Sequence, residues 1–345
     1  MLATAGPAGR VAQQRWTGML KPAAIGAIVV AALLVPQFTD RRDTLNLLFL
    51  IYLYVTMAQS WNILAGYAGQ INLGHAAFFG VGAWTTRGLW TDEDVPFMFA
   101  FFMGGVVAMV FAIVFGIVTF RLRGVYFAIG TLALAEAMRL TVANLLPNIE
   151  ALPGPTIARY ELEPRYYLAL GLALFAATTV LLLPRLRISL GILAVREDEA
   201  AAEASGVNPL LHKLFALALS SFFAGLAGGT FAFYHVSYYP SFTFSPVWTF
   251  DAVLATFIGG IGTVAGPIVG GVFFIFVRER LAVSLVEVHQ IIFGTLFILV
   301  VLTLPGGLVE AWSRLRRLAM LLIRRSPRRE KRGDVDLDPR SRSDA

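Results

Sequence analysis

Long apolar runs separated by short polar breaks restrict the fold of this sequence more than any other feature. A helix needs about 20 apolar residues to cross the hydrocarbon core of a membrane. By that criterion we expect spans at residues 23–38, 45–64, 71–90, 97–120, 125–147, 165–183, 214–236, 247–262, 266–277 and 288–308. The run at 266–277 is too short to cross alone, so we expect it to be re-entrant or continuous with its neighbour. The pattern predicts an all-α, polytopic transmembrane helical bundle of about 8–10 spans.

Composition supports a membrane protein and excludes several classes of site. Hydrophobic residues make up 57% of the chain and charged residues 14%, whereas soluble domains average about 45–50% and about 25%. Cysteine is absent, so disulfides and thiolate metal sites are excluded. The four histidines form no local metal motif, and the chain has no Gly-Lys dipeptide for a Walker A loop. We expect no catalytic residue, no metal and no cofactor bound by this chain.

The basic residues cluster where the positive-inside rule places cytoplasmic loops. Arg121 and Arg123 lie in one short loop, and further cations lie in the long break at 184–213 and in the tail. We expect three parts: a cytoplasmic N-terminal segment (1–22), a transmembrane domain (23–312) and a basic, disordered cytoplasmic tail (313–345). Both termini then lie on the cytoplasmic side. The net charge of +6 fits anionic membrane lipids better than nucleic acid.

The segment from Trp61 to Trp84 is apolar but differs from an ordinary membrane helix. Its sequence is WNILAGYAGQINLGHAAFFGVGAW, in which five glycines and three polar side chains interrupt the apolar run. Non-helical backbone at membrane depth is tolerated only inside protein or beside a wet cavity, and broken helices recur around transporter sites. The segment is a broken helix beside a transport pathway, a tightly packed helix pair with small residues at the contact, or both. The candidate pathway residues are Gln70, Asn72, His75, Phe78 and Phe79.

The longest polar break between spans, residues 184–213, predicts a short cytoplasmic helix. Residues from Ile192 to Ser205 have helix-forming composition, Gly206 stands where a helix C-cap belongs, and Pro209 prevents continuation. Small alanines beside acidic side chains suit docking into a groove of another protein, although a solvated loop helix without a partner fits as well. The candidate docking residues are Arg196, Glu197, Asp198, Glu199, Glu203 and Gly206.

A glycine repeat occurs near the C-terminal end of the membrane region, in the run FIGGIGTVAGPIVGG. Gly262, Gly266 and Gly270 recur at every fourth position, so we expect them on one helical face that packs closely against another helix. Pro267 should kink or divide this element. The repeat therefore predicts helix packing.

Three ionisable residues fall inside the predicted spans, where charges are costly. Glu136 and Arg139 are three positions apart and therefore share a helical face, so they can pair with each other. Asp251 lies near the start of its span and fits the membrane interface. Each of the three is also a candidate for contact with a transported solute.

Several of these segments together resemble permeases of branched-chain amino acid ABC importers, the LivH/LivM family. The similar blocks occur in the family's order and are Trp61–Trp84, Arg121–Arg139, Gly191–Pro209, Ser220–Gly229, Gly259–Gly271 and Pro305–Leu308. The RLRGVYFA run and the long REDEAAAEASG run look more like the LivM-type subunit than the LivH type. In the general ABC coupling pattern Gly follows EAA after three residues, whereas here Gly206 lies seven residues after Glu199. The fit is closer to the branched-chain form.

The resemblance implies a multi-pass permease in the cytoplasmic membrane of a bacterium. It would form the path for branched-chain or related hydrophobic amino acids, with the cytoplasmic helix as coupling helix. The implied partners are a second, LivH-like permease subunit, two cytoplasmic ATPases that carry ATP and Mg²⁺, and an extracytoplasmic amino acid-binding protein. No enzymatic activity is implied for this chain itself.

Three alternatives stay open at this point. Importers of urea and short-chain amides use similar permeases. An ion-coupled secondary transporter typically has acidic residues at mid-membrane and inverted repeats. This sequence has few acidic residues within its predicted spans and no clear sign of inverted repeats. An intramembrane enzyme would need a nucleophile paired with a base, which is not recognisable here.

Overall fold

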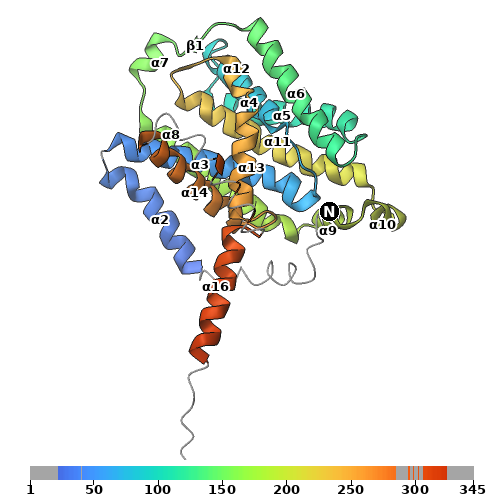
Figure 1. The fold of residues 1–345 in the computed structure, drawn as a ribbon. Coiled ribbons are helices and arrows are strands. Elements are labelled where there is room, and N and C mark those ends of the chain that lie inside the picture. The colour runs from blue at the N-terminus through green and yellow to red at the C-terminus, as the bar shows by residue number, and fades with distance from the viewer. Residues whose placement is uncertain are drawn as a thin grey trace, which may run out of the picture.

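A computed structural model of the chain describes residues 22–39, 41–284 and 306–324, together with positions 294, 295, 298 and 302. Within these residues the chain is almost entirely helical (Figure 1). The helices are α2 (Pro22–Phe38), α3 (Arg42–Asn62), η2 (Ile63–Tyr67), α4 (His75–Thr91), α5 (Phe97–Thr119), α6 (Val125–Leu145), α7 (Gly154–Ala158), α8 (Leu162–Leu182), η3 (Leu183–Arg185), α9 (Arg187–Glu197), α10 (Glu199–Ala204), α11 (Pro209–Tyr234), α12 (Pro240–Thr243), α13 (Val247–Gly259), α14 (Ala265–Ser284) and α16 (Gly307–Arg324). Two short strands, β1 (Glu150–Ala151) and β2 (Ser237–Tyr238), pair antiparallel.

Six of the described helical segments are long and apolar enough to cross a membrane. They are Arg42–Tyr67, Phe97–Thr119, Val125–Leu145, Leu162–Arg185, Pro209–Tyr234 and Pro240–Gly259. The prediction of an all-α polytopic membrane bundle is confirmed. The expected span at 288–308 lies almost wholly outside the described residues.

The short run expected at 266–277 is part of a longer helix, so the predicted length was wrong. Helix α14 has 20 residues and continues through Arg278 to Ser284. The apolar pattern ends at Arg278, but the helix does not, because Arg278 has a partner inside the bundle. Its guanidinium donates to the Asp251 carboxylate over 2.7 Å, and the Tyr54 hydroxyl donates to the same oxygen over 3.0 Å. Asp251 is therefore buried within the bundle, beside its two partners.

Helix α11 forms the centre of the bundle and packs against α3, α4, α5 and α8. Small residues allow this close approach. A Cβ added at Gly82 would overlap the backbone of Gly225, and one added at Gly228 would overlap the carbonyl of Phe79. The glycines of α4 and α11 thus fit the two helices against each other without side chains between them.

A polar cap covers the end of the bundle where β1 and β2 pair. The buried guanidinium of Arg87 donates to three carbonyl oxygens, those of Ala232, His235 and Val236, over 2.8, 3.1 and 2.9 Å. Burial raises the pKa of the neighbouring Glu150 carboxyl, and the positive charge of Arg87 partly offsets this rise. Arg87 therefore satisfies the carbonyls left free where α11 ends.

Part of the expected disordered tail is helical. Residues 313–324 belong to α16, which extends away from the bundle in Figure 1. Apolar and basic side chains alternate in this stretch with the period of a helix, a pattern that stabilises an amphipathic helix at a surface. The remaining tail positions, 325–345, lie outside the described residues.

Candidate functional site

The apolar segment around Gly66 to Gly74 is a broken helix, as its sequence predicted. Helix α3 ends in the π-helical turn η2, residues 69–74 are not helical, and α4 begins at His75. Gly69 has a φ of +70°, a conformation that suits glycine. The side chain of Asn72 accepts a hydrogen bond of 2.8 Å from the Gly74 N–H and so replaces a missing helical partner.

The same segment is also closely packed, so its glycines serve both the break in the helix and the contact with its neighbours. A Cβ at Gly74 would overlap the carbonyl of Thr131 on α6, and one at Gly66 would meet the backbone of Gly262 at 2.8 Å. These two glycines are therefore contact points between the broken helix and its neighbours.

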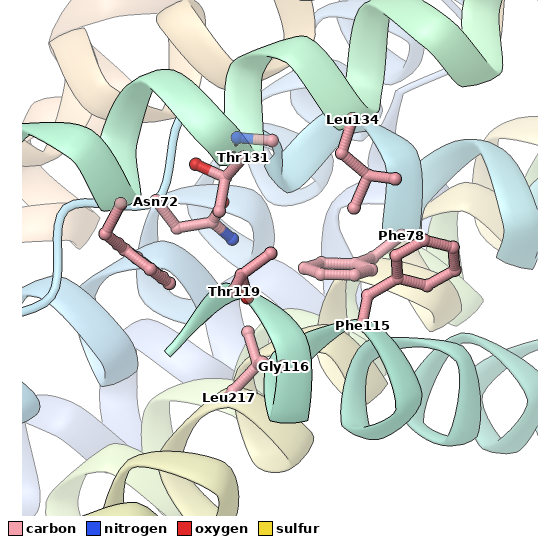
Figure 2. A pocket seen from close by; sticks show the side chains of 10 residues that line it. Asn72, Phe78, Phe115, Gly116, Thr119, Thr131, Leu134 and Leu217 are labelled. Atoms are coloured by element: carbon pink, nitrogen blue, oxygen red, sulfur yellow. Dashed lines mark hydrogen bonds between the residues drawn. The ribbon is translucent and has the colours of Figure 1, made fainter. Parts of the chain in front are cut away.

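Two of the five candidate pathway residues line one small cavity. Asn72 and Phe78 face it together with Thr131 and Leu134 of α6 and residues from α5 and α11, as Figure 2 shows. The cavity has a volume of about 10 Å³, which is room for about one water molecule. The Asn72 side-chain nitrogen is buried and has no hydrogen-bond partner. An amino acid does not fit this cavity, so it is no open path in this conformation.

The other three candidates lie elsewhere. His75 is buried and shares a hydrogen bond of 2.7 Å between its Nε2 and the Ser60 hydroxyl. Phe79 stacks on Trp248 with ring centroids 4.5 Å apart, inside the packed core. Gln70 is half-buried at the end of the broken segment, and its side-chain nitrogen reaches the Ala68 carbonyl over 3.5 Å. His75 and Phe79 are thus packed inside the bundle in this conformation, and Gln70 lies in the non-helical segment that follows η2.

The predicted cytoplasmic helix is two helices, so the expectation of one continuous helix from Ile192 to Ser205 was wrong. Asp198 has φ −157° and ψ 113°, which separates α9 from α10. Its carboxylate accepts hydrogen bonds from the Ala200 and Ala201 N–H groups over 2.9 and 3.0 Å. An aspartate in this position is an N-cap, and that preference outweighs the helical composition of its neighbours. The C-cap prediction for Gly206 is confirmed by its φ of +84°.

Five of the six candidate docking residues are exposed, and bonds within the chain involve exposed and half-buried positions alike. Glu199 pairs with the buried Lys213 of α11 over 2.6 Å, which ties α10 to the bundle. Arg196 donates to the Gly66 carbonyl over 2.5 Å. Glu197 and Glu203 are exposed on the surface of the helix pair. Most of the predicted docking residues are therefore accessible to a partner, whereas Glu199 is engaged with Lys213.

The glycine repeat does not lie on one helical face. Gly262 is in the loop between α13 and α14, with a φ of +75°, whereas Gly266 and Gly270 are in α14. The one-face prediction was wrong for Gly262, because the positive φ of Gly260 and Gly262 ends α13 before the repeat can continue as a helix. The packing prediction is right for Gly270, where a Cβ would overlap the Ala255 carbonyl of α13.

A cluster of side-chain hydrogen bonds connects the loop between α13 and α14 to α3. It was not predicted from the sequence. The Asn62 side chain accepts from the Gly262 N–H over 2.7 Å and donates to the Thr263 carbonyl over 3.0 Å. Gln59 donates to the Val264 carbonyl over 2.7 Å. The sequence does contain an indication of these contacts, because Gln59, Ser60 and Asn62 are polar residues within an otherwise apolar span. Together with Arg196, these contacts connect α3, α9 and the α13–α14 loop.

Comparisons with known proteins agree on one family. A family model described as "Branched-chain amino acid transport system / permease component" matches residues 44–301. The chain is 28% identical over 316 residues to the "High-affinity branched-chain amino acid transport system permease protein LivM" of Escherichia coli (strain K12), covering 82% of this chain and 73% of that protein. The LivM protein of Salmonella typhimurium matches with the same identity and coverage. A "Probable branched-chain amino acid transport permease protein LivM" of Methanocaldococcus jannaschii is 24% identical over 325 residues, covering 77% and 93%. No solved structure matches the chain.

Proposed function

This chain belongs to the branched-chain amino acid transport permease family and is a membrane-spanning permease subunit of an ABC importer; from that premise we propose that it carries leucine, isoleucine and valine. These solutes are zwitterions with an apolar side chain. They need a path with mostly apolar walls and a few neutral dipoles or compensated charges. Asn72 and Gln70 offer amide dipoles, and Phe78 offers apolar surface beside one of them.

The observation that supports transport driven by an ATPase is the bonded connection between the cytoplasmic helix pair and the broken helix. Arg196 of α9 bonds to Gly66, and Gly66 packs against Gly262. A movement of α9 and α10 therefore directly changes the surroundings of Gly66, where α3 ends in the turn η2. This is what a permease driven by an ATPase on its cytoplasmic face requires, and a secondary transporter has no need of it.

The proposal includes the partners. The α9–α10 pair docks in a groove of an ATPase, and two such ATPases supply ATP hydrolysis with Mg²⁺. A second, LivH-like permease subunit completes the path, and an extracytoplasmic binding protein delivers the amino acid. The complex sits in the cytoplasmic membrane of a bacterium, with both termini of this chain on the cytoplasmic side.

Reconstitution of the complete complex in vesicles tests the proposal. We expect leucine uptake only when the binding protein, both ATPases and ATP are present, with inhibition by vanadate and none by a proton uncoupler. Leucine uptake by this permease pair without binding protein and ATPases would overturn the proposal in favour of a secondary transporter. Uptake of urea with no uptake of leucine would keep the ABC importer and refute the amino acid substrate.

A further inference from the structure

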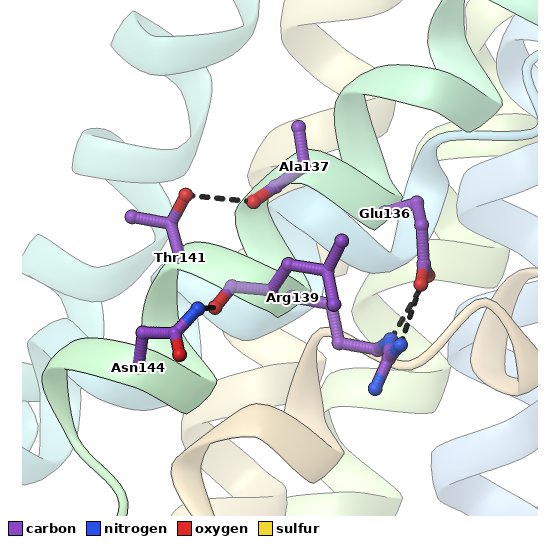
Figure 3. A network of polar contacts seen from close by, with 6 residues as sticks. Glu136, Ala137, Arg139, Thr141 and Asn144 are labelled. Atoms are coloured by element: carbon purple, nitrogen blue, oxygen red, sulfur yellow. Dashed lines mark hydrogen bonds and ion pairs between the residues drawn. The ribbon is translucent and has the colours of Figure 1, made fainter.

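An ion pair lies in the middle of α6, on a side of the helix that the described residues leave partly exposed. Arg139 donates to Glu136 twice, from Nε over 2.9 Å and from the terminal nitrogen over 2.5 Å, as Figure 3 shows. The Arg139 side chain is 34% exposed and that of Glu136 is 40% exposed. Glu136 lies about 17 Å along the helix axis from Val125, near the centre of a membrane-length helix. The pairing expected from the sequence is confirmed.

Small and polar residues lie beside the pair on this side of α6, together with the apolar Ile129 and Leu140, which are 57% and 50% exposed. Ala133, Ala137, Thr141 and Asn144 are all exposed and follow one another at helical spacing. The Thr141 hydroxyl and the Asn144 amide donate to carbonyls of their own helix, those of Ala137 and Leu140, each over 2.8 Å. We call the surface formed by these four residues and the ion pair the α6 polar face.

Helix α5 provides the contrast within the same chain. Its exposed side chains are bulky and apolar, among them Phe102, Val110 and Val114 at 52%, 51% and 57% exposure. Such a surface suits contact with lipid tails, whereas charged side chains at membrane depth almost always face protein or a water-filled cavity. Helix α5 has no charged side chain, whereas α6 adds an exposed ion pair to its own exposed apolar residues, so the two neighbouring helices differ in the charges that they present.

The opposite side of α6 packs onto the broken helix. Thr131 is buried, and its hydroxyl oxygen accepts a hydrogen bond of 3.1 Å from the Leu73 N–H. The α6 polar face thus lies on the side of α6 away from the glycine-rich segment, and its four small and polar residues are exposed in the part of the chain that the structure describes.

We propose that the α6 polar face lines a water-filled path toward the second permease subunit, and that Arg139 and Glu136 exchange their mutual pair for the carboxylate and ammonium groups of the passing amino acid. This inference rests on the proposed function. The charges are complementary: a zwitterion presents one group of each sign, and the ion pair does the same. Because the pair has no net charge, the path carries no uncompensated charge before or after the solute passes. The exchange forms and breaks only hydrogen bonds, so the solute is held weakly and released.

The absence of cysteine from the chain allows a direct test of whether the α6 polar face is wet. In the complete complex, Ala137→Cys should react with a hydrophilic, cationic thiol reagent at least tenfold faster than Val114→Cys on the apolar side of α5. Reaction of Ala137→Cys should slow when leucine-loaded binding protein and ATP are present. If both cysteines are equally unreactive, the face lies in lipid or in a dry interface, and the inference is overturned.

The double variant Glu136→Gln/Arg139→Gln tests the charges themselves. The amides keep a hydrogen bond between the two positions but remove both charges. We expect leucine uptake per assembled complex to fall at least tenfold, with the affinity of the binding protein unchanged and ATP consumed per leucine rising by the same factor. Uptake within twofold of the native complex would show a merely structural pair and overturn the inference. If the double variant does not assemble, the reactivity of Ala137→Cys beside the native pair decides.

The outcomes separate this inference from the proposed function. A native complex that moves no leucine although Ala137→Cys is reactive refutes the substrate assignment and the exchange with it, while the wet face remains. A native complex that moves leucine while Ala137→Cys is unreactive refutes the inference alone.

Discussion

Arg196 of α9 donates a hydrogen bond of 2.5 Å to the carbonyl oxygen of Gly66, at the π-helical turn where α3 ends. The two residues are 130 positions apart in the chain. A π-helical turn leaves its carbonyls with poorer partners than an α-helix does, so the guanidinium stabilises the break itself. The cytoplasmic helix pair and the broken helix are therefore joined by one charge-assisted bond.

Replacing Arg196 by alanine should uncouple ATP hydrolysis from transport. Loss of a hydrogen bond to a charged group costs on the order of 2 kcal/mol. In Arg196→Ala this loss weakens the contact between α9 and the turn η2. We expect leucine uptake to fall about tenfold, while basal ATPase activity of the assembled complex stays near its native rate. Arg187→Ala, at the exposed start of the same helix, is the matched control and should keep native coupling. Native coupling in Arg196→Ala would show that this bond transmits nothing.

The ion pair between Glu199 and Lys213 should be structural rather than part of the docking surface. Lys213 is 4% exposed, so Glu199→Lys leaves a buried ammonium facing a second positive charge. We expect a loss of stability on the order of 2 kcal/mol, measured by thermal unfolding of the purified complex. The swap Glu199→Lys/Lys213→Glu should recover most of it.

Glu203→Lys on the exposed side of α10 is the comparison variant for that experiment. It should leave stability unchanged and lower the ATPase activity stimulated by the loaded binding protein. Equal effects of Glu199→Lys and Glu203→Lys on stability would mean that the pair with Lys213 contributes little.

The sequence predicted features that depend on one residue or on close neighbours. Gly206 required a positive φ because it follows a helix, and Glu136 pairs with Arg139 because they are three positions apart. Features that depend on distant partners were missed. The partner of Asp251 is Arg278, and the helix through Arg278 continues only because Asp251 lies beside it. No local pattern contains that information.

The candidate site was predicted in outline and not in detail for the same reason. Glycines in an apolar run indicate a broken helix, and it is present. Which side chains face a cavity depends on how α5, α6 and α11 pack around the break, so the sequence could not show that Asn72 and Phe78 line it while His75 and Phe79 pack in the core. The division into α9 and α10 at Asp198 was also missed, because the preference of aspartate for a helix N-cap outweighs the helix-forming composition of its neighbours.

Labelling of single cysteines should establish the orientation. Cysteine at Ala158, in the exposed helix α7, should react with a membrane-impermeant maleimide in intact cells. Cysteine at Ala201, which is exposed on α10, should react only after permeabilisation; Ala202 is unsuitable because it is buried against its neighbours. Labelling of Ala201→Cys in intact cells would invert the topology and remove the coupling role of α9 and α10.

Asn72 and Gln70 should differ in what their loss does. Asn72 is 1% exposed and accepts the Gly74 N–H, while its backbone carbonyl accepts from the Trp61 indole over 2.8 Å. Asn72→Leu removes the acceptor and leaves a buried N–H unpaired, which costs about 1–3 kcal/mol, so both stability and leucine uptake should fall. Gln70 is half-buried and makes one long contact, so Gln70→Leu should change the free energy of unfolding by no more than about 0.5 kcal/mol. It should lower the rate of leucine uptake only if the solute passes the non-helical turn at Gln70. Neither change should alter the affinity of the binding protein for leucine.

Thermal unfolding of the purified complex and uptake by reconstituted vesicles, measured on the same preparations, separate the effect on stability from the effect on transport. Native uptake by Gln70→Leu would move the path away from this turn and toward the side of the bundle where Asn72 and Phe78 face α6.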